Sequence, residues 1–278
     1  MRMAAFLVVL ALTACSQVQG GAVQQERRSL PRVVSLNPCS DAILAQVAEP
    51  EQILALSHFS SDPASSSMDL AVAARFPSVT GTAEEVLSLR PDMVFADPFV
   101  PPATRAALER SGIDLVTMPI ARSVDDSREQ VKELARLTGN EGAGIILAAQ
   151  IDAALARAAA PRSNVPIPAI VWQSGGIVPG RDTLVADLLA HTGFVLQSAA
   201  RGMTQADYLP LEHVLAAPPR AILIAGDGRA QENRLLDHPA LNYLAETRRI
   251  AFDSSLLWCG GPTIIRAAEH LAQTRKSL

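Results

Sequence analysis

The sequence is poor in aromatic residues and cysteine, and it has no long hydrophobic run after its first residues. Aromatic residues make up 4% of the 278 residues, including two tryptophans and two tyrosines. So few rings leave little material for a broad stacking surface under a large planar ligand. Only three cysteines are present, which excludes a disulfide-rich scaffold. No apolar stretch beyond residue 30 is long enough to span a bilayer.

Basic clusters and short catalytic motifs are also missing. The net charge is −4, with no run of lysine or arginine, which indicates neither nucleic-acid binding nor a polybasic membrane patch. Sequences of the types H-E-x-x-H, G-x-S-x-G and C-x-x-C are absent, and the glycine-rich residues 174–181 match no phosphate-binding loop. The five histidines are scattered along the chain. We therefore expect no cofactor, no metal site and no catalytic residue.

The N-terminus has the features of a bacterial export signal. A basic start at Arg2 precedes an apolar segment that is too short for a membrane span, and this segment ends in Leu-Thr-Ala-Cys at residues 12–15. That ending resembles a lipobox, which predicts lipidation of Cys15 after cleavage. The alternative is an ordinary signal peptide in which Cys15 is incidental. We expect a signal peptide over residues 1–15, a flexible tether over residues 16–30, and a periplasmic or cell-surface protein that meets the membrane only through its lipid.

Strand and helix patterns alternate through most of the remaining chain. Short buried runs followed by amphipathic segments predict mostly parallel sheets covered by helices. Between residues 123 and 159 this alternation stops, and alanine-rich sequence predicts continuous helix, although Gly139, Gly142 and Gly144 could bend or divide it. We therefore expect an α/β fold with two Rossmann-like lobes, at residues 31–121 and 163–278, joined by one long helix over residues 122–162.

One segment occurs twice in similar form. Residues 84–95 and 212–223 each begin with a glutamate, continue through Val-Leu to a proline, and end in an apolar strand. This pattern predicts two short helices, each with a carboxylate in its first turn, at equivalent places in the two lobes. Glu84 and Glu212 could therefore form a pair of docking points. The alternative is a common helix–stop–strand pattern that arose twice by chance.

Several loops that follow predicted strands are candidates for a ligand cleft, because α/β sheets bind ligands at the carboxyl ends of their strands. A helix after the first strand is expected to be capped by Ser40 or Asp41. Trp258 is the expected apolar platform, unless it is buried against the last helix. The candidate ligand-binding residues are Asn37, Cys39, His58, Phe59, Phe99, Gln173 and Trp258.

Cys39 and Cys259 remain as a pair if Cys15 is lipidated, and an exported protein meets an oxidising compartment. Each follows a predicted strand, in different lobes. The two could form a disulfide across the cleft or contact a soft metal. The alternative is two separate, partly buried thiols.

Together these motifs resemble a known family. Arg-Val-Val-Ser-Leu-Asn-Pro at residues 32–38, the two Glu-x-Val-Leu segments, the long middle helix and Gly-Pro at residues 261–262 are similar to substrate-binding proteins of ABC importers for cobalamin, ferric siderophores and haem. The resemblance covers roughly residues 31–275. It implies a monomer that binds a metal chelate between two lobes and delivers it, without catalysis, to an inner-membrane permease and its ATPase. It also implies that Glu84 and Glu212 dock to arginines of the permease.

The resemblance does not settle the ligand. The low aromatic content leaves cobalamin and a ferric siderophore open, with haem third. Haem-binding members of the family usually offer a Tyr or His ligand, and here His58 is the best placed, whereas Tyr208 and Tyr243 are not in obvious cleft loops. Two other classes also stay open: a secreted α/β enzyme with a dispersed site, and a lipoprotein that binds only a protein partner.

Overall fold

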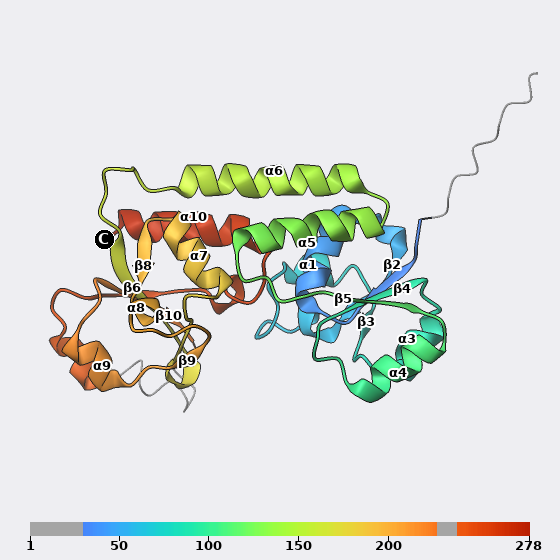
Figure 1. The fold of residues 1–278 in the computed structure, drawn as a ribbon, viewed down its shortest axis with the longest axis horizontal. Coiled ribbons are helices and arrows are strands. Elements are labelled where there is room, and N and C mark those ends of the chain that lie inside the picture. The colour runs from blue at the N-terminus through green and yellow to red at the C-terminus, as the bar shows by residue number, and fades with distance from the viewer. Residues whose placement is uncertain (1–29, 227–237) are drawn as a thin grey trace, which may run out of the picture.

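The computed structural model describes residues 30–226 and 238–278, in which two lobes lie side by side (Figure 1). Each lobe contains a parallel sheet, and a layer of long helices runs along one side of both lobes (Figure 1). The alternation of strand and helix in the sequence predicts this α/β fold, and the structure confirms it. Residues 1–29, which include the predicted signal peptide with Cys15 and all of the predicted tether except residue 30, lie outside the described residues.

The first lobe is built on a five-stranded parallel sheet with the order β3-β2-β1-β4-β5. Its strands are β1 (Val33–Ser35), β2 (Ile53–Ser57), β3 (Ser78–Val79), β4 (Met93–Ala96) and β5 (Asp114–Thr117). Its helical elements are α1 (Pro38–Val47), η1 (Pro50–Gln52), η2 (His58–Ser61), α2 (Leu70–Ala73), α3 (Ala83–Leu89) and α4 (Pro102–Arg110). The strand order reverses next to β1, and such a reversal leaves a crevice at the carboxyl ends of the strands.

The second lobe has a four-stranded parallel sheet, β11-β10-β6-β8, and a small antiparallel pair, β7 with β9. Its strands are β6 (Ile167–Gln173), β7 (Ile177–Val178), β8 (Phe194–Leu196), β9 (Asp207–Tyr208), β10 (Ala221–Ala225) and β11 (Arg248–Ala251). Its helical elements are η3 (Ser174–Gly176), α7 (Leu184–His191), α8 (Gln197–Ala200), α9 (Leu211–Ala216), η5 (Pro239–Tyr243), η6 (Ser254–Leu256) and α10 (Thr263–Lys276).

The helical segment between the lobes differs from the expectation of one long helix over residues 122–162. It forms a hairpin of α5 (Val124–Leu137) and α6 (Glu141–Ala158), and α6 runs along both lobes (Figure 1). The chain turns because Gly139 adopts a positive φ of 77°, the usual conformation just after a helix end. Gly144 then lets α6 approach α5, since a Cβ atom there would lie 2.5 Å from the Cβ of Ala135. The connecting helix is therefore α6 alone.

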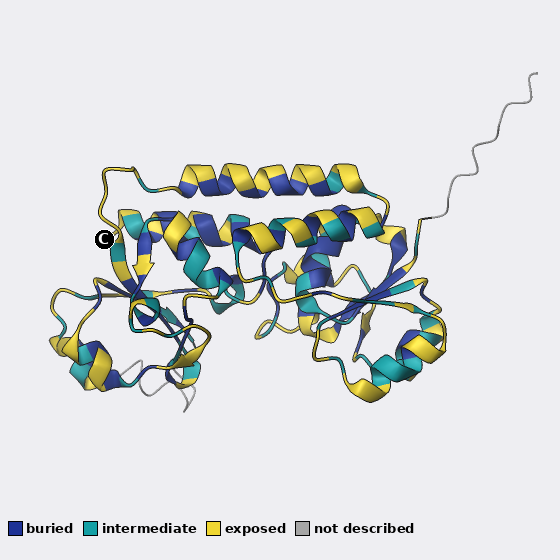
Figure 2. Ribbon diagram, viewed as in Figure 1, coloured by how far each residue is buried: buried dark blue, intermediate teal, exposed yellow. Residues whose placement is uncertain are grey.

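Burial shows how α6 holds the two lobes. Its inner face, including Leu147, Ile151 and Leu155, is buried, whereas Ile145 and Ile146 face solvent (Figure 2). The inner face belongs to a continuous hydrophobic core that includes residues of both lobes and of α5 and α10. In the part of the chain that the structure describes, no helix combines the length and the hydrophobicity needed to cross a membrane.

Candidate ligand-binding cleft

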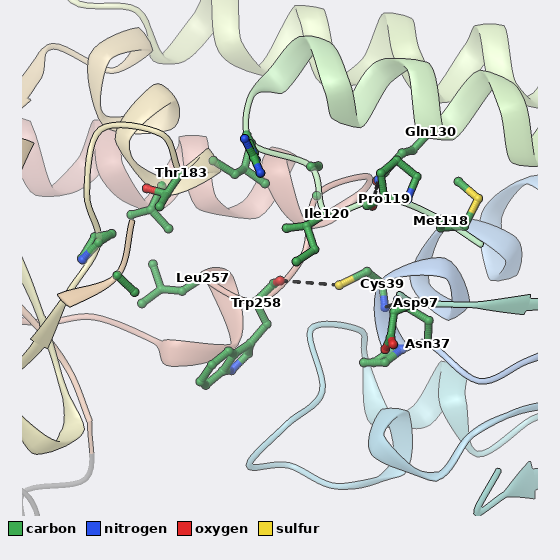
Figure 3. A pocket seen from close by; sticks show the side chains of 18 of the residues that line it. Asn37, Cys39, Asp97, Met118, Pro119, Ile120, Gln130, Thr183, Leu257 and Trp258 are labelled. Carbon is green, nitrogen blue, oxygen red and sulfur yellow. Dashed lines mark hydrogen bonds between the residues drawn. The ribbon is translucent and has the colours of Figure 1, made fainter. Parts of the chain in front are cut away.

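A cavity of about 430 Å³ lies between the lobes, and residues of both lobes line it (Figure 3). The first lobe contributes the segments that follow β1, β4 and β5, together with the start of α5. The second lobe contributes Gln173 at the end of β6, the loop before α7, and residues 257–260. This position at the carboxyl ends of parallel strands is where open α/β sheets bind ligands.

Five of the seven predicted ligand residues line this cavity: Asn37, Cys39, Phe99, Gln173 and Trp258. The other two, His58 and Phe59, do not. They lie in η2, with their ring centres 4.0 Å apart, and Phe59 is 45% exposed. In the sheet, β2 lies on the opposite side of β1 from β4 and β5, so the segment that follows β2 does not join the cavity wall. For these two residues the prediction is corrected.

Asn37 is positioned by its role at the start of α1. Its Oδ1 accepts hydrogen bonds from the backbone N–H groups of Cys39 and Ser40, at 2.7 and 3.1 Å. Asn37 is therefore the N-cap, in place of the expected Ser40 or Asp41, and Pro38 takes the first helical position that suits proline. The side-chain Nδ2 of Asn37 has no partner among the described residues and remains available to a ligand.

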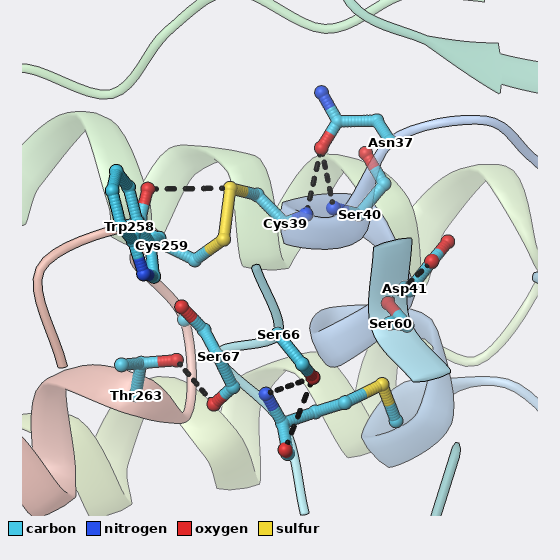
Figure 4. The surroundings of a disulfide bond; sticks show 12 residues. Asn37, Cys39, Ser40, Asp41, Ser60, Ser66, Ser67, Trp258, Cys259 and Thr263 are labelled. Atoms are coloured by element: carbon cyan, nitrogen blue, oxygen red, sulfur yellow. Dashed lines mark hydrogen bonds between the residues drawn. A yellow bond between two sulfur atoms is a disulfide. The ribbon is translucent and has the colours of Figure 1, made fainter. Parts of the chain in front are cut away.

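Cys39 and Cys259 form a disulfide between the lobes, with their Cα atoms 5.0 Å apart (Figure 4). The Cys39 sulfur also lies 3.5 Å from the carbonyl oxygen of Trp258. On the far side of Cys259, the backbone N–H of Gly261 donates to Ser127 Oγ of α5 at 2.6 Å. Residues 258–261 are therefore held by α1 and by α5, and this places Trp258 at the cavity.

A second set of contacts ties the lobes together near the disulfide (Figure 4). The Ser67 hydroxyl donates to the carbonyl oxygen of Ser255 at 2.7 Å. The carbonyl oxygen of Ser67 in turn accepts from the Thr263 hydroxyl at 3.4 Å and from the Arg266 guanidinium. The lobes are thus connected here by a covalent bond and by several hydrogen bonds, which favours a cleft of nearly constant width.

The cavity walls expose large apolar side chains from both lobes. Phe99 is 75% exposed, Ile120 is 60% exposed and Trp258 is 50% exposed. Phe99 is held by its own loop, since its backbone N–H donates to Asp97 Oδ1 at 2.7 Å. Water-exposed rings that face a cavity are a favourable surface for a bulky, partly apolar ligand. Trp258 is therefore not buried against the last helix.

The sequence analysis missed one wall of the cavity. Residues 118–122, directly after β5, line it and continue into an adjoining cavity of about 790 Å³ that runs along α5. These residues carry no motif, because Met118, Pro119 and Ile120 are ordinary apolar residues. The rule that loops after parallel strands line the cleft would have selected them if it had been applied to β5. The contributions of Asp182 and Gln205 had no comparable signal.

The polar lining of the cavity is mostly uncharged. Its charged residues are Asp97, Arg122 and Asp182, and its carboxamides are Asn37, Gln130, Gln173 and Gln205. Among the described residues, no histidine or tyrosine lines it, and no group of three or more His, Cys, Asp and Glu side chains is arranged to hold a metal ion. Tyr208 and Tyr243 are 47% and 87% exposed and lie outside the cavity.

A buried carboxyl group lies beneath the cleft, in the first turn of α1. Asp41 is fully buried, and its Oδ2 accepts from the backbone N–H of Ser57 at 2.9 Å and from Ser60 Oγ at 2.6 Å. Its Oδ1 has no partner. Burial raises the pKa of Asp41 to about 8, although hydrogen bonding to Ser35, Ser60 and Ser57 acts in the opposite direction. A protonated Asp41 therefore links α1 to the segment after β2 at neutral pH.

The two repeated glutamates are exposed in the first turns of α3 and α9. These helices lie at opposite ends of the molecule, on the side away from α6 (Figure 1). In α3 the neighbouring Glu85 has a different role. It completes a capping box with Thr82, and a hydrogen bond from the Thr80 hydroxyl contributes most to holding its pKa below the usual range. This leaves Glu84 as the free carboxylate of that turn.

Residues 33–249, which include both lobes and the connecting helix, match the family model described as periplasmic binding protein. The chain belongs to this family. This periplasmic binding protein is also 28% identical over 166 residues to a cobalamin-binding protein of Halobacterium salinarum, a match that covers 58% of the chain and 44% of that relative. The match thus spans less than half the length of the curated relative.

Solved structures share the fold of this periplasmic binding protein. The periplasmic heme-binding protein RhuT from Roseiflexus sp. RS-1 is 25% identical, with a TM-score of 0.67 and coverage of 89% of this chain and 97% of that chain. The vitamin B12-binding protein BtuF of Vibrio cholerae is 20% identical, with the same TM-score and coverages. The heme-binding protein HutB of Vibrio cholerae is 19% identical, with a TM-score of 0.71 and coverage of 88% and 98%. At 20% and 19% identity, the similarities to BtuF and HutB show a shared fold and nothing more.

Proposed function

We propose that this periplasmic binding protein is the substrate-binding lipoprotein of an ABC importer. It captures a cobalamin or a ferric-siderophore-type chelate between its lobes and delivers it to the permease. The observation that carries this proposal is the cavity between the lobes, into which both lobes present exposed apolar side chains (Figure 3). A bulky chelate with an apolar surface would cover Phe99 and Trp258 and remove them from water.

Haem is the second candidate, because RhuT, at 25% identity, is a heme-binding protein. The lining of the cavity favours the first two ligands over haem. No histidine or tyrosine is among its described lining residues, and Cys39 is joined to Cys259. A metal ion bound here would therefore have to be coordinated already by its own chelate. Cobalamins and ferric siderophores meet this condition, whereas an open haem iron would gain no strong axial ligand from these residues.

Delivery requires contact with the permease, and Glu84 and Glu212 are the residues that we assign to it. Both are exposed in first helical turns, where a carboxylate is favoured by the helix dipole. They belong to helices at the two ends of one side of the molecule (Figure 1). Arginine is the matching partner, because its guanidinium binds a carboxylate through two parallel hydrogen bonds. A lipid on Cys15 would keep the protein near that partner.

Differential scanning calorimetry with cyanocobalamin, ferrichrome and haemin tests the proposal. A ligand at 100 times its Kd stabilises the folded state by about 2.7 kcal/mol, which raises the Tm by several degrees. We expect cyanocobalamin or the ferric siderophore to raise the Tm and to be recovered chemically unchanged after incubation. An unchanged Tm with all three ligands, or conversion of a bound ligand to a product, would contradict the proposed function.

A further inference from the structure

We infer that the cleft selects a chelate whose outer surface is rich in amide-type hydrogen-bonding groups and carries no net negative charge, and that it discriminates against polyanionic chelates. This inference rests on the proposed function and narrows the ligand class for the same cavity. Three features of the described lining support it. They are the carboxamides, the balance of charges, and the lack of side chains that could fill an open coordination position of a metal ion.

Four carboxamide side chains line the cavity, and each has unused hydrogen-bonding capacity. Asn37 uses its oxygen to cap α1 and keeps its Nδ2 without a partner among the described residues. Gln130 donates from Nε2 to the carbonyl oxygen of Pro119, which leaves its Oε1 available. The residues whose side-chain amides have no hydrogen bond to described residues are Gln173 and Gln205. A primary amide both donates and accepts, so it pairs well with amides on a ligand.

These carboxamides come from both sides of the cleft. Asn37 and Gln130 belong to α1 and α5, whereas Gln173 and Gln205 belong to the second lobe. A ligand that carries amides on only one edge would leave one of the two groups unpaired. A ligand with amides around its periphery satisfies both groups while its apolar faces cover Phe99 and Trp258.

The charged residues oppose an anionic ligand. Asp97 and Asp182 line the cavity from opposite lobes, and Arg122 is the only basic residue among its described lining residues. The described lining of the adjoining cavity along α5 adds three carboxylates, Asp126, Glu129 and Glu133, and no further basic residue. Glu129 and Glu133 pair with Lys132 and Arg136 at 2.9 and 2.7 Å, and Asp182 lies 3.6 Å from the guanidinium of Arg181. Asp97 is therefore the lining carboxylate of the first cavity that has no ion-pair partner among the described residues.

Arg122 has no carboxylate within ion-pair distance among the described residues, so it can accept one anionic group of a ligand. Several anionic groups would exceed this capacity. The extra charges would lie close to Asp97 or Asp182 and lose their hydration without a cationic partner, and like charges in such a site cost binding free energy. The lining therefore accommodates neutral and cationic chelates, including one with a single phosphate, and disfavours catecholate complexes and porphyrin carboxylates.

Equilibrium dialysis with four probes tests this selectivity. Cyanocobalamin presents amides and little charge, ferrioxamine B is cationic, and ferric enterobactin and haemin are anionic. We expect cyanocobalamin or ferrioxamine B to bind at least about tenfold more tightly than either anionic chelate at low salt. Tightest binding of ferric enterobactin or haemin would overturn the inference and leave the proposed function standing. If none of the four probes bound, and ferrichrome did not bind either, the proposed function itself would fail, and the inference with it.

Charge-removing variants connect the selectivity to named residues. The double variant Asp97→Asn with Asp182→Asn keeps hydrogen-bond acceptors at both positions. It should weaken ferrioxamine B about fivefold or strengthen haemin by a similar factor at low salt, with the effect shrinking as salt is added. Asp114→Asn is the matched control, because Asp114 is exposed at the other end of β5. If the double variant and Asp114→Asn gave the same affinities for all four probes, the charges would have no part in selection.

Discussion

Cys39 and Cys259 lie 220 residues apart in the sequence, yet their Cα atoms are 5.0 Å apart, and their disulfide joins the two lobes beside the ligand cavity. Cys39 also lines that cavity, so the bridge is part of the cleft wall. A hydrogen bond from the Ser67 hydroxyl to the carbonyl oxygen of Ser255 adds a second connection nearby. The angle between the lobes is therefore restricted at the cleft itself as well as by α6 behind it.

Removal of the disulfide should destabilise the protein and leave its fold intact. A cross-link that closes so long a loop limits the unfolded chain, and its loss typically costs about 2–5 kcal/mol. We expect the double variant Cys39→Ser with Cys259→Ser to unfold at lower guanidinium concentration than the wild type. Reductant should destabilise the wild type and leave the double variant unchanged. Two alkylatable thiols in the native, unreduced protein would show that the bridge does not form.

Trp258 should contribute directly to ligand binding. It is half exposed in the free protein, so a ligand that covers it removes a large apolar surface from water. We expect Trp258→Ala to weaken binding of the identified ligand by about tenfold to thirtyfold, and Trp258→Phe to weaken it less. The matched control is Tyr243→Ala, because Tyr243 is 87% exposed and does not line the cavity. Equal affinities for Trp258→Ala and the wild type would remove Trp258 from the site.

Asp41 should make the stability depend on pH. Burial raises its pKa from 3.8 to about 8, so the folded state keeps the proton that the unfolded chain releases. Its contribution to the free energy of unfolding is full below about pH 4 and is lost progressively as the pH rises to about 8. The total loss is on the order of several kcal/mol.

The variant Asp41→Asn isolates this effect, because asparagine has a similar shape and does not ionise. We expect the stability of the wild type relative to Asp41→Asn to fall steadily between pH 4 and pH 8. Urea unfolding at each pH measures this difference, and other titrating groups cancel in the comparison. Parallel pH profiles for the two proteins would mean that Asp41 titrates alike in the folded and unfolded states.

Glu84 and Glu212 should act on transport and not on ligand capture. Neither residue lines the ligand cavity. If the permease presents arginines to these residues, as we propose, the double charge reversal Glu84→Arg with Glu212→Arg would place cations opposite them. We expect uptake in cells that carry the importer to fall at least about tenfold. Ligand affinity and Tm should remain close to the wild-type values.

Glu141→Arg provides the matched control for the charge reversal. Glu141 is also an exposed glutamate in a first helical turn, but it belongs to α6 on the opposite side of the molecule (Figure 1). We expect this variant to transport normally. Normal uptake by the Glu84→Arg and Glu212→Arg double variant would refute the docking role.

The close contact between α5 and α6 should be sensitive to a single methyl group. A Cβ atom on Gly144 would lie 2.5 Å from the Cβ of Ala135, so Gly144→Ala should push the helices apart and cost about 1–3 kcal/mol. At Gly142 the corresponding space is open. Gly142→Ala should therefore stabilise the protein by roughly 0.5–1 kcal/mol through helix propensity alone. Equal unfolding midpoints for the two variants would contradict this packing.

Local sequence patterns were enough to predict most elements of the fold. The alternation of short buried runs and amphipathic segments predicted mostly parallel sheets covered by helices, and both lobes have such a sheet. The carboxyl-end rule also selected five candidate ligand-binding residues that line the cavity. It failed for His58 and Phe59 because it does not say which strand ends face the other lobe. That depends on strand order, which the local pattern does not contain.

The sequence by itself determined the alternation of strands and helices, the pair of exposed helix-start glutamates and the candidate cysteine pair, because each of these depends on neighbouring residues and their spacing. Tertiary structure alone decided the hairpin of α5 and α6, the approach of Cys39 to Cys259 and the burial of Asp41. These features depend on contacts between residues far apart in the chain, such as Gly144 with Ala135. The free energy of such contacts comes from packing and burial, and these are defined only when the whole chain has folded.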